Sequence, residues 1–412
     1  MNPPGNETRV AELLRDYLAD NGVEGELYAR APERANLVAR LPGSGRGRSL
    51  LLLSHTDTVV ADPAEWQVDP WSGEVRDGEL WGRGALDMKG QVAAEAVALA
   101  SLAREGFEPA GDLVFAACAD EEVGSGFGLQ WLCQSHPDAV RTDYALNEGA
   151  GERLELFGRP FYVCSCAEKM SSPFRLFVRG RAGHASVPGI ADNALVKAAV
   201  LIERLAAYQP ELRLGPETDA MIQAVAGRPL TAEEALELAR ATDETAAELL
   251  APLLSLTLSP TMISASETRN VIPHLCTVDV DCRLLPEQSQ EEVEPILRDV
   301  LGDGDFEFGW LEGWGGTRSE LGTPLWDAVV SFVDKIEPDA TVLPVCVAGF
   351  TDSHWLRAAF GTVAYGFFPS NAMDPKLASR LIHSADERTA VDDLELAVDC
   401  FRHAAVEVTG GS

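Results

Sequence analysis

The chain has 412 residues, a length that favours two hydrophobic cores over one. Hydrophobic residues make up 46% and charged residues 24%, which is typical of a globular protein. Its 33 basic and 65 acidic residues give a net charge of −32, which argues against nucleic acid and anionic membranes as partners. The N-terminal residues lack the basic start and apolar core of a signal peptide, and no apolar run approaches membrane-spanning length. We therefore expect a cytoplasmic protein whose eight scattered cysteines are reduced.

The first 60 residues combine one predicted helix with three predicted strands: 7–20, 25–29, 36–41 and 50–53. The consecutive leucines of the last segment are typical of a strand buried on both faces, as in a parallel sheet. His55 and Asp57 follow this strand, and side chains two apart on an extended chain point the same way. The pair fits a metal-binding histidine held by a carboxylate, but for this stretch alone an ordinary polar strand end is an equally good interpretation.

Acidic residues follow at further points of the chain. Asp87 lies among glycines just before an alanine-rich helix predicted over 91–103, and capping this helix is its simplest role. The apolar strand predicted over 112–118 runs into Glu121 and Glu122. Neighbouring acids repel one another unless a cation lies among them, so these residues indicate either a cation site or a solvated acidic loop.

A third predicted strand, 144–147, is followed directly by Glu148. Three strands therefore place a histidine or an acid at their C-terminal ends, and in an open α/β sheet these ends share one crevice where ligands bind. An imidazole and several carboxylates in one crevice suit zinc, manganese or cobalt. Four separate solvated loops are the competing interpretation.

The pattern changes after about residue 169. Strands and helices then mix without repeated strand–helix units: we predict strands at 174–178, 256–265 and 275–284, and helices at 192–208, 229–254 and 288–301. This segment is typical of an α+β domain inserted into the first one. The predicted boundaries are 1–169 for the first part of the first domain, 170–318 for the inserted domain, and 319–412 for the second part.

Seven motifs are spread over nearly the whole chain. They are Ser54-His55-Thr56-Asp57-Thr58, Gly82-Arg83-Gly84-Ala85-Leu86-Asp87-Met88-Lys89-Gly90, Asp120-Glu121-Glu122-Val123-Gly124-Ser125, Glu168-Lys169, Gly183-His184-Ala185-Ser186, Asn270-Val271-Ile272-Pro273, and His383 with Asp386-Glu387. In type and order they resemble the motifs of the M20 family of metallopeptidases and amidohydrolases, which includes glutamate carboxypeptidase, acetylornithine deacetylase, succinyl-diaminopimelate desuccinylase and aminoacylase.

The resemblance implies an α/β catalytic domain, with a mixed, largely parallel sheet flanked by helices, interrupted by a smaller α+β lid or dimerisation domain. It implies two divalent metal ions, most often zinc, with cobalt or manganese as alternatives. The metal ligands carried over from the family are Asp87, which bridges both ions, His55 and Glu148 at one site, and Glu122 and His383 at the other. Asp57 would orient His55, and Glu121 would act as the general base.

The resemblance also assigns residues outside the metal ligands. His184 resembles the lid histidine that stabilises the tetrahedral oxyanion, which in dimeric relatives comes from the partner subunit. Asn270, Arg283 and Thr351 resemble residues that hold the carboxylate side of the substrate, although Arg283 is equally well interpreted as a surface arginine on a strand. Thr351 lies in Ala348-Gly349-Phe350-Thr351-Asp352, where many relatives have a Gly-Gly-Thr type of loop.

We therefore expect a metal-dependent hydrolase that cleaves an amide bond of a small peptide or an N-acyl amino acid, and that can form a homodimer through its lid. The type of residue at Glu148 favours a carboxypeptidase or a deacylase within the family, and the choice between these two stays open. The alternative is a catalytically inactive relative that serves as a binding or scaffold protein. The acidic helical segment over 211–254 receives no role.

Overall fold

The computed structural model describes residues 1–242 and 244–410, which form two compact units. The first unit comprises 1–166, 319–345 and the chain from Thr351 onward, and the second comprises 167–318 and 346–350. The chain therefore passes between the units four times, whereas the sequence suggested two passages. The additional excursion arises at the end of β17 (Thr341–Val347), where the carbonyl of Val347 accepts a hydrogen bond from the backbone N–H of Lys169 at 2.9 Å.

The first unit is organised around a nine-stranded mixed sheet with the order β1-β2-β6-β3-β7-β18-β9-β17, to which β8 is added beside β9. Strands β6, β3, β7 and β18 run parallel to one another, whereas β1–β2, β2–β6 and β18–β9 are antiparallel pairs. The expected mixed, largely parallel sheet is thus confirmed. Besides β17, the strands of this sheet are β1 (Gly25–Ala29), β2 (Ala35–Leu41), β3 (Leu50–His55), β6 (Leu113–Cys118), β7 (Tyr144–Asn147), β8 (Arg153–Leu156), β9 (Arg159–Glu168) and β18 (Val363–Gly366).

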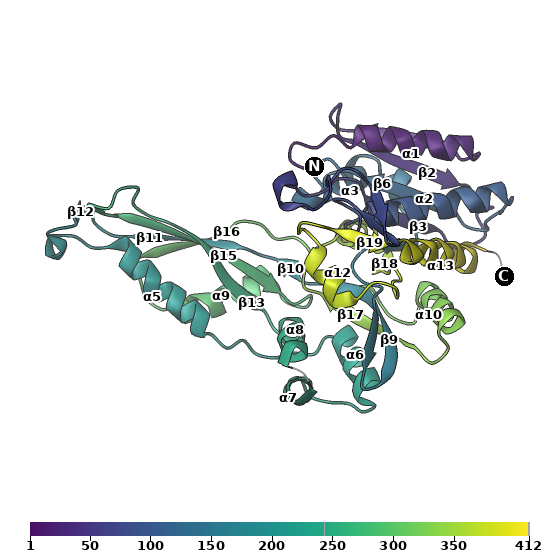
Figure 1. Ribbon diagram of the computed structural model, residues 1–412. Helices are drawn as coiled ribbons and strands as arrows, with labels where there is room; N and C mark the ends of the chain where they lie inside the picture. The colour runs from purple at the N-terminus through teal and green to yellow at the C-terminus, as the bar shows by residue number, and fades with distance from the viewer. Residues whose placement is uncertain (243, 411–412) are drawn as a thin grey trace. The chain divides into compact units, whose positions relative to one another are not determined.

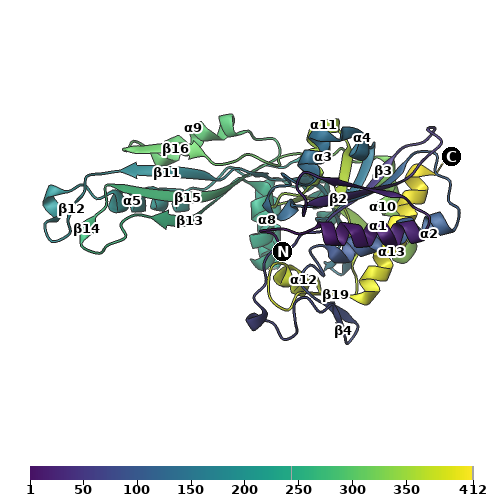
Figure 2. The same ribbon diagram turned by 90° about the horizontal axis from the view of Figure 1, so that it is seen from above.

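Helices cover both faces of this sheet, and the leucines of β3 show why. Leu50 and Leu52 belong to one apolar cluster and Leu51 and Leu53 to another, because alternate side chains of a strand point to opposite faces. The first cluster is closed by α1 (Thr8–Asp20), α2 (Lys89–Arg104), α10 (Pro324–Ile336) and α13 (Val391–Thr409), and the second by α3 (Leu129–Ser135), α4 (Pro137–Val140) and α11 (Ser353–Phe360). Figures 1 and 2 show these two helical layers.

Short elements complete the first unit. A three-stranded sheet of order β19-β5-β4 joins a segment before Asp87 to a segment after His383. These elements are η1 (Pro63–Glu65), β4 (Glu74–Arg76), β5 (Glu79–Trp81), η2 (Glu121–Val123), α12 (Pro375–Leu381) and β19 (Arg388–Ala390).

The second unit contains an antiparallel sheet of order β10-β15-β11-β16, with β13 on the other side of β15. Alternate side chains of β15 are buried against α5 and α9, which cover one face of the sheet (Figure 1). A two-stranded ribbon, β12 with β14, lies at one end. The elements are β10 (Met170–Ser171), β11 (Phe174–Arg179), β12 (Gly183–His184), η3 (Pro188–Ile190), α5 (Ala194–Ala207), β13 (Thr257–Ser264), β14 (Val271–Ile272), β15 (Leu275–Leu284), α9 (Gln290–Leu301) and β16 (Phe306–Trp310).

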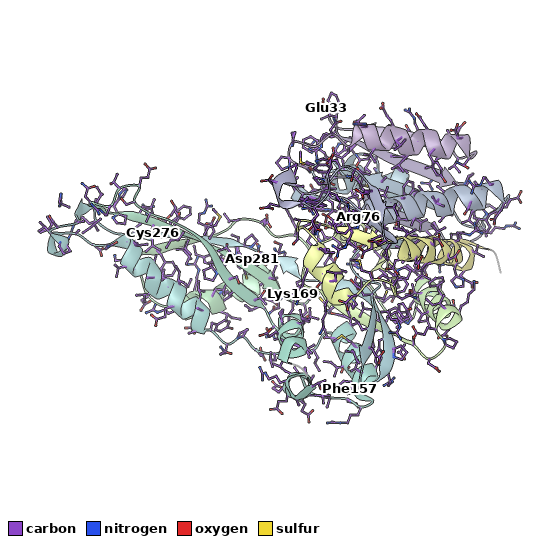
Figure 3. All side chains as sticks on the ribbon, viewed as in Figure 1. Glu33, Arg76, Phe157, Lys169, Cys276 and Asp281 are labelled. Carbon is purple, nitrogen blue, oxygen red and sulfur yellow. The ribbon has the colours of Figure 1, made fainter. Side chains whose placement is uncertain are left out.

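The helical segment expected over 229–254 comprises α7 (Ala232–Thr242) and α8 (Glu244–Leu254), and residue 243 lies outside the described residues. Together with α6 (Pro216–Ala226), they build a small apolar core of their own. The buried side chain of Lys169, labelled in Figure 3, anchors this region, since its Nζ donates to the carbonyls of Pro252 and Ser255, each at 2.8 Å.

Two further expectations concern the whole chain. All eight cysteines are unpaired, as expected for reduced thiols, and all eight are buried. Within the part of the chain that the structure describes, none of the helices combines the length and the apolar character needed to cross a membrane.

Candidate metal centre

The parallel strands bring the predicted ligands together. In the sheet order β6-β3-β7, the three strands end at Cys118, His55 and Asn147, so their C-terminal ends are adjacent. His55 is the last residue of β3, Glu122 lies in the turn after β6, and Glu148 directly follows β7. This is the crevice that strand topology predicts for an open α/β sheet.

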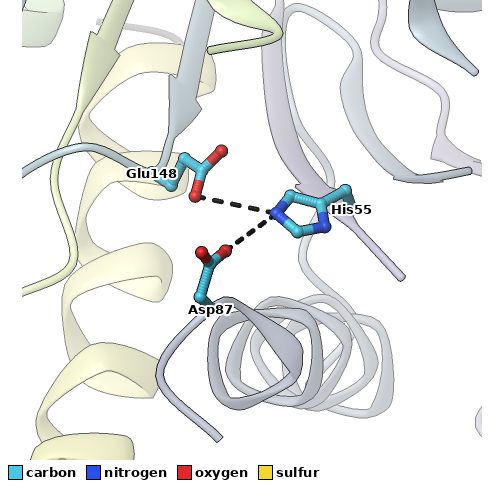
Figure 4. A group of neighbouring side chains, drawn as sticks. All are labelled: His55, Asp87 and Glu148. Atoms are coloured by element: carbon cyan, nitrogen blue, oxygen red, sulfur yellow. Dashed lines mark hydrogen bonds and ion pairs between the residues drawn. The ribbon is translucent and has the colours of Figure 1, made fainter. Parts of the chain in front are cut away.

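Asp87 links two groups of possible metal ligands. His55, Asp87 and Glu148 form the first group, and Asp87, Glu122 and His383 form the second, with the ligand atoms of each group within 4.8 Å of one another. Figure 4 shows the first group, in which Asp87 and Glu148 both point toward the imidazole of His55.

The two oxygens of Asp87 contact different histidines. Its Oδ1 lies 3.0 Å from His55 Nε2, and its Oδ2 lies 3.0 Å from Nε2 of His383, which also lies 3.2 Å from Glu122 Oε2. The N-cap of α2 is Met88, without a capping hydrogen bond from a side chain. Helix capping by Asp87, the simplest interpretation from the sequence alone, is therefore wrong.

Asp57 contacts both His55 and the turn that carries Glu121 and Glu122. Its carboxylate is buried, and its Oδ1 lies 3.4 Å from His55 Nδ1, whose other neighbour is the Asp57 carbonyl at 3.2 Å. Nδ1 thus faces two oxygens of Asp57, whereas Nε2 faces Asp87 and Glu148, so Nε2 is the ring nitrogen that could bind a metal within the first ligand group. Asp57 also accepts the backbone N–H groups of Glu121 and Glu122 at 3.1 and 3.2 Å.

The neighbours Glu121 and Glu122 take different positions. Glu122 belongs to the second ligand group, and its Oε1 accepts the N–H of Val59 at 3.1 Å. Glu121 belongs to neither group, and its Oε2 lies 4.0 Å from His55 Nε2. The preceding Asp120 has a left-handed backbone with φ of 72°, which starts the tight turn η2 and directs both following N–H groups toward Asp57.

Glu387 holds the loop that carries Asp87. It is a buried residue of the last sequence motif, to which the sequence alone assigns no role. It accepts backbone N–H groups from Gly84, Leu86 and Asp87 at 3.1, 2.8 and 3.1 Å, and its own charge is matched by Arg83 at 2.6 Å. The loop is thus held from inside by one side chain. Because these donors are backbone groups, no motif of side chains could have indicated this arrangement.

Electrostatics of the cluster are dominated by crowded acids. Burial raises the pKa of Glu121, and the negative charge of Glu148 raises it further. Burial opposes the charged form of His55, but the charge of Glu148 and hydrogen bonding to Asp57 outweigh it and raise its pKa well above the ordinary value. Hydrogen bonds to Asp87 and then Glu122 raise the pKa of His383 to about 10. Such a cluster favours additional positive charge at its centre.

A cavity of about 190 Å³ lies beside Asp87 and Glu148 within the first unit. Its apolar wall is formed by Phe368, Met373 and Ile382. Among the described residues that line it there is no lysine or arginine, whereas several acids are present. An uncharged group suits this space better than an anionic one.

The remaining predicted residues lie in both units. His184, on β12, is exposed, and its Nδ1 accepts the backbone N–H of Ser186 at 3.2 Å. Its other ring nitrogen therefore carries the proton of the neutral imidazole and is a donor. Asn270 directly precedes β14, the second strand of the same ribbon, and its carbonyl accepts the N–H of Ala185 at 3.0 Å.

Arg283 and Thr351 lie in different units, Arg283 in the second and Thr351 in the first. The guanidinium of Arg283 on β15 is held by Asp281 at 3.0 and 2.9 Å, which agrees with the interpretation as a surface arginine on a strand. Thr351 is buried in the first unit, where its hydroxyl accepts the N–H of Ser353 at 3.3 Å.

The family follows from comparison with known proteins. The model of peptidase family M20/M25/M40 matches residues 51–407, and the chain belongs to this family. It is 33% identical over 377 residues to succinyl-diaminopimelate desuccinylase of Rhodospirillum centenum, covering 87% of this chain and 80% of that protein.

Solved structures share the fold. The M20 family metallo-carboxypeptidase Sso-CP2 from Sulfolobus solfataricus matches with a TM-score of 0.73 at 20% identity, covering 98% of this chain and 94% of that one. The Bacillus subtilis protein YxeP, a dinuclear metal-binding peptidase of the M20 family, matches with a TM-score of 0.63 at 14% identity, covering 98% and 92%. The chain is thus a member of a family of metal-dependent peptidases and amidohydrolases.

Proposed function

We propose that the protein hydrolyses an amide bond of a small peptide or an N-acyl amino acid with two divalent metal ions, most simply zinc. The observation that carries this proposal is the pair of ligand groups that share Asp87. The donor set fits the ions, because imidazole nitrogens and carboxylate oxygens are ligands of zinc, cobalt and manganese. The proposed ligands are Asp87 for both ions, His55 and Glu148 for one, and Glu122 and His383 for the other.

Two ions held there would polarise the amide carbonyl and lower the pKa of the attacking water. Glu121 acts as the base in this proposal: its carboxylate takes the proton of the water and delivers it to the leaving nitrogen. Its position supports the role, since Glu121 lies at the edge of the ligand groups without belonging to either. Asp57 positions His55 and, through two backbone N–H groups, the turn that carries Glu121.

His184 is proposed to donate a hydrogen bond to the oxyanion of the tetrahedral intermediate. Support comes from its ring, in which Ser186 occupies Nδ1 and leaves an exposed Nε2–H donor. Asn270, next to it on the ribbon, and Thr351 are the proposed substrate contacts. Arg283 takes part only if it exchanges Asp281 for a substrate carboxylate.

The substrate proposal covers two related classes. The relative from Rhodospirillum centenum is a desuccinylase by name, and Sso-CP2 is a carboxypeptidase. The lack of basic residues among the described residues around the 190 Å³ cavity favours an uncharged acyl or side chain over a succinyl group there. The cavity therefore supports small peptides and N-acyl amino acids with uncharged groups.

A homodimer formed through the second unit is also part of the proposal. Within the described residues, the edge strand β13 pairs with β15 alone and exposes Met262 and Ile263, and the helix α5 that packs beside it exposes Val196. An unpaired strand edge next to exposed apolar side chains is a surface that a second copy of the chain can cover.

Metal removal tests the proposal directly. We expect chelation to abolish turnover of a panel of dipeptides and N-acyl amino acids, and zinc, cobalt or manganese to restore it. Elemental analysis of the reactivated protein should find about two metal ions per chain. Activity that does not depend on metal, or a protein that binds two ions and hydrolyses none of the panel, would contradict the proposal, and the latter result would favour a binding or scaffold protein.

A further inference from the structure

We propose that Asn2, in the N-terminal segment, is a positioning residue of the candidate metal centre. Its side-chain amide holds the carboxylates of Asp57 and Asp120, and through them the imidazole of His55 and the turn that carries Glu121. This inference rests on the proposed function, because it concerns the residues that surround the proposed metal ligands.

The segment 1–7 folds back onto the first unit as a hook. The backbone N–H of Asn2 donates to the carbonyl of Thr58 at 2.8 Å, and Gly5 closes a turn onto the carbonyl of Met1 at 3.0 Å. The carboxylate of Glu7 then accepts two hydrogen bonds from Arg34, at 2.7 and 3.0 Å. Hydrogen bonds to Thr58 and Arg34 thus hold both ends of the hook on the rest of the first unit.

Gly5 is needed where the hook passes Arg34. Its φ is +81°, and a Cβ atom at this position would lie 2.4 Å from the guanidinium of Arg34. The same guanidinium donates to the carbonyl of Pro4 at 3.1 Å and lies 2.5 Å from Asp120 Oδ1. A side chain at position 5 would therefore displace the hook, and Asn2 with it, while every side chain that contacts Asp57 keeps its chemical identity.

The amide of Asn2 bridges two buried carboxylates. Its Nδ2 donates to Asp57 Oδ2 and to Asp120 Oδ1, each at 2.9 Å, and Asn2 itself is only 4% exposed. Hydrogen bonds to ionised acceptors are stronger than those between neutral groups. A neutral amide supplies two of them without placing another positive charge next to the metal ligands.

Asn2 completes the set of donors around Asp57. One oxygen of this carboxylate faces His55 and the N–H of Glu121, and the other accepts from Glu122 and from Asn2. Of these four, only Asn2 has no other part in the proposed centre. Loss of a group that orients a metal-binding histidine typically lowers metal affinity tenfold to a hundredfold.

Three variants test the inference. Asn2→Ala removes both hydrogen bonds, and Asn2→Asp keeps the shape but replaces the donor by an acceptor that repels Asp57 and Asp120. Gly5→Ala displaces the hook while leaving Asn2 itself unsubstituted. We expect each to weaken metal binding at least about tenfold in competition with a chelator, and to alter the visible absorption spectrum of the cobalt-substituted protein.

A matched control is Asn21→Ala. Asn21 also makes side-chain hydrogen bonds in the first unit, to the carbonyl of Tyr17 and from Arg104, but neither partner contacts Asp57. We expect it to change thermal stability only. Wild-type metal affinity and an unaltered cobalt spectrum in Asn2→Ala and Asn2→Asp would overturn the inference while the proposed function stands, and a wild-type protein that binds no metal would overturn both.

Discussion

Asp57 shows what a local sequence pattern can predict and what it cannot. The pairing of His55 with a residue two positions later follows from strand geometry, and the structure has the two side chains 3.4 Å apart. The other contacts of this carboxylate come from Asn2, Glu121 and Glu122, which lie 55 to 65 positions away in the chain. Backbone donors and a neutral amide carry no recognisable spacing, so this part of the site becomes visible only in the folded chain.

The division of roles between Glu121 and Glu122 leads to a prediction at the scale of one residue. Glu121→Gln preserves the side-chain shape and the backbone hydrogen bond to Asp57 but removes the proton acceptor. We expect turnover to fall at least about a hundredfold with metal content near that of the wild type. Steady-state kinetics together with elemental analysis of the purified variant measures both quantities.

The neighbouring residue supplies the control. Glu122→Gln changes the same chemical group one position away, but Glu122 lies 3.2 Å from His383 in the second ligand group. We expect this variant to lose metal together with activity. If Glu121→Gln lost metal to the same extent, Glu121 would have to be moved into the set of metal ligands.

At the scale of secondary structure, long apolar elements were predictable and short ones were not. The strands β7 and β15 have the predicted bounds, because each combines a clear apolar pattern with turn residues at its ends. The three-stranded sheet of β4, β5 and β19 was missed, since strands of three residues are too short for a periodic pattern. That sheet matters for the site, because it ties together the segments that carry Asp87 and His383.

The helix α2 contains a buried acid that gives rise to a prediction about pH. Glu95 is fully buried, its Oε1 accepts a hydrogen bond from Gln91 at 2.8 Å, and burial raises its pKa to about 8. Between pH 4.5 and 8 the folded chain keeps a proton that the unfolded chain releases. The contribution of this group to stability is therefore full below pH 4.5 and is lost as the pH rises toward 8.

Glu95→Gln should remove this pH dependence, because glutamine keeps the shape of the protonated acid and does not ionise. We expect the variant to be more stable than the wild type at pH 8, by on the order of a few kcal/mol, with a difference that shrinks toward pH 5. Denaturant unfolding at several pH values measures this difference, and Glu33→Gln on the surface serves as the control. A difference that stays constant between pH 5 and 8 would show that Glu95 ionises alike in both states.

At the scale of the whole molecule, the chain divides into two units, and the predicted boundaries at 169/170 and 318/319 lie close to the passages at 166/167 and 318/319. The excursion of 346–350 into the second unit was not predicted, because it depends on the contact of one strand end with Lys169 rather than on composition. All five proposed metal ligands lie in the first unit, whereas His184 lies in the second.

Because His184 and the proposed metal ligands lie in different units, variants of His184 can show whether a site is completed within one chain or by a partner subunit. We expect His184→Ala to lower kcat by about a hundredfold or more, the usual effect of losing an oxyanion donor, with metal content and KM little changed.

Coexpression of His184→Ala with Glu121→Gln then distinguishes two arrangements. If His184 acts on the partner subunit, each heterodimer holds one intact site, so random pairing should restore about a quarter of wild-type activity. If it acts within its own chain, the mixture stays inactive, because each chain carries one defect. The double variant His184→Ala/Glu121→Gln controls for chance recovery, because it leaves no intact site with either single variant in both arrangements. A His184→Ala protein with wild-type turnover would remove this histidine from the mechanism in both arrangements.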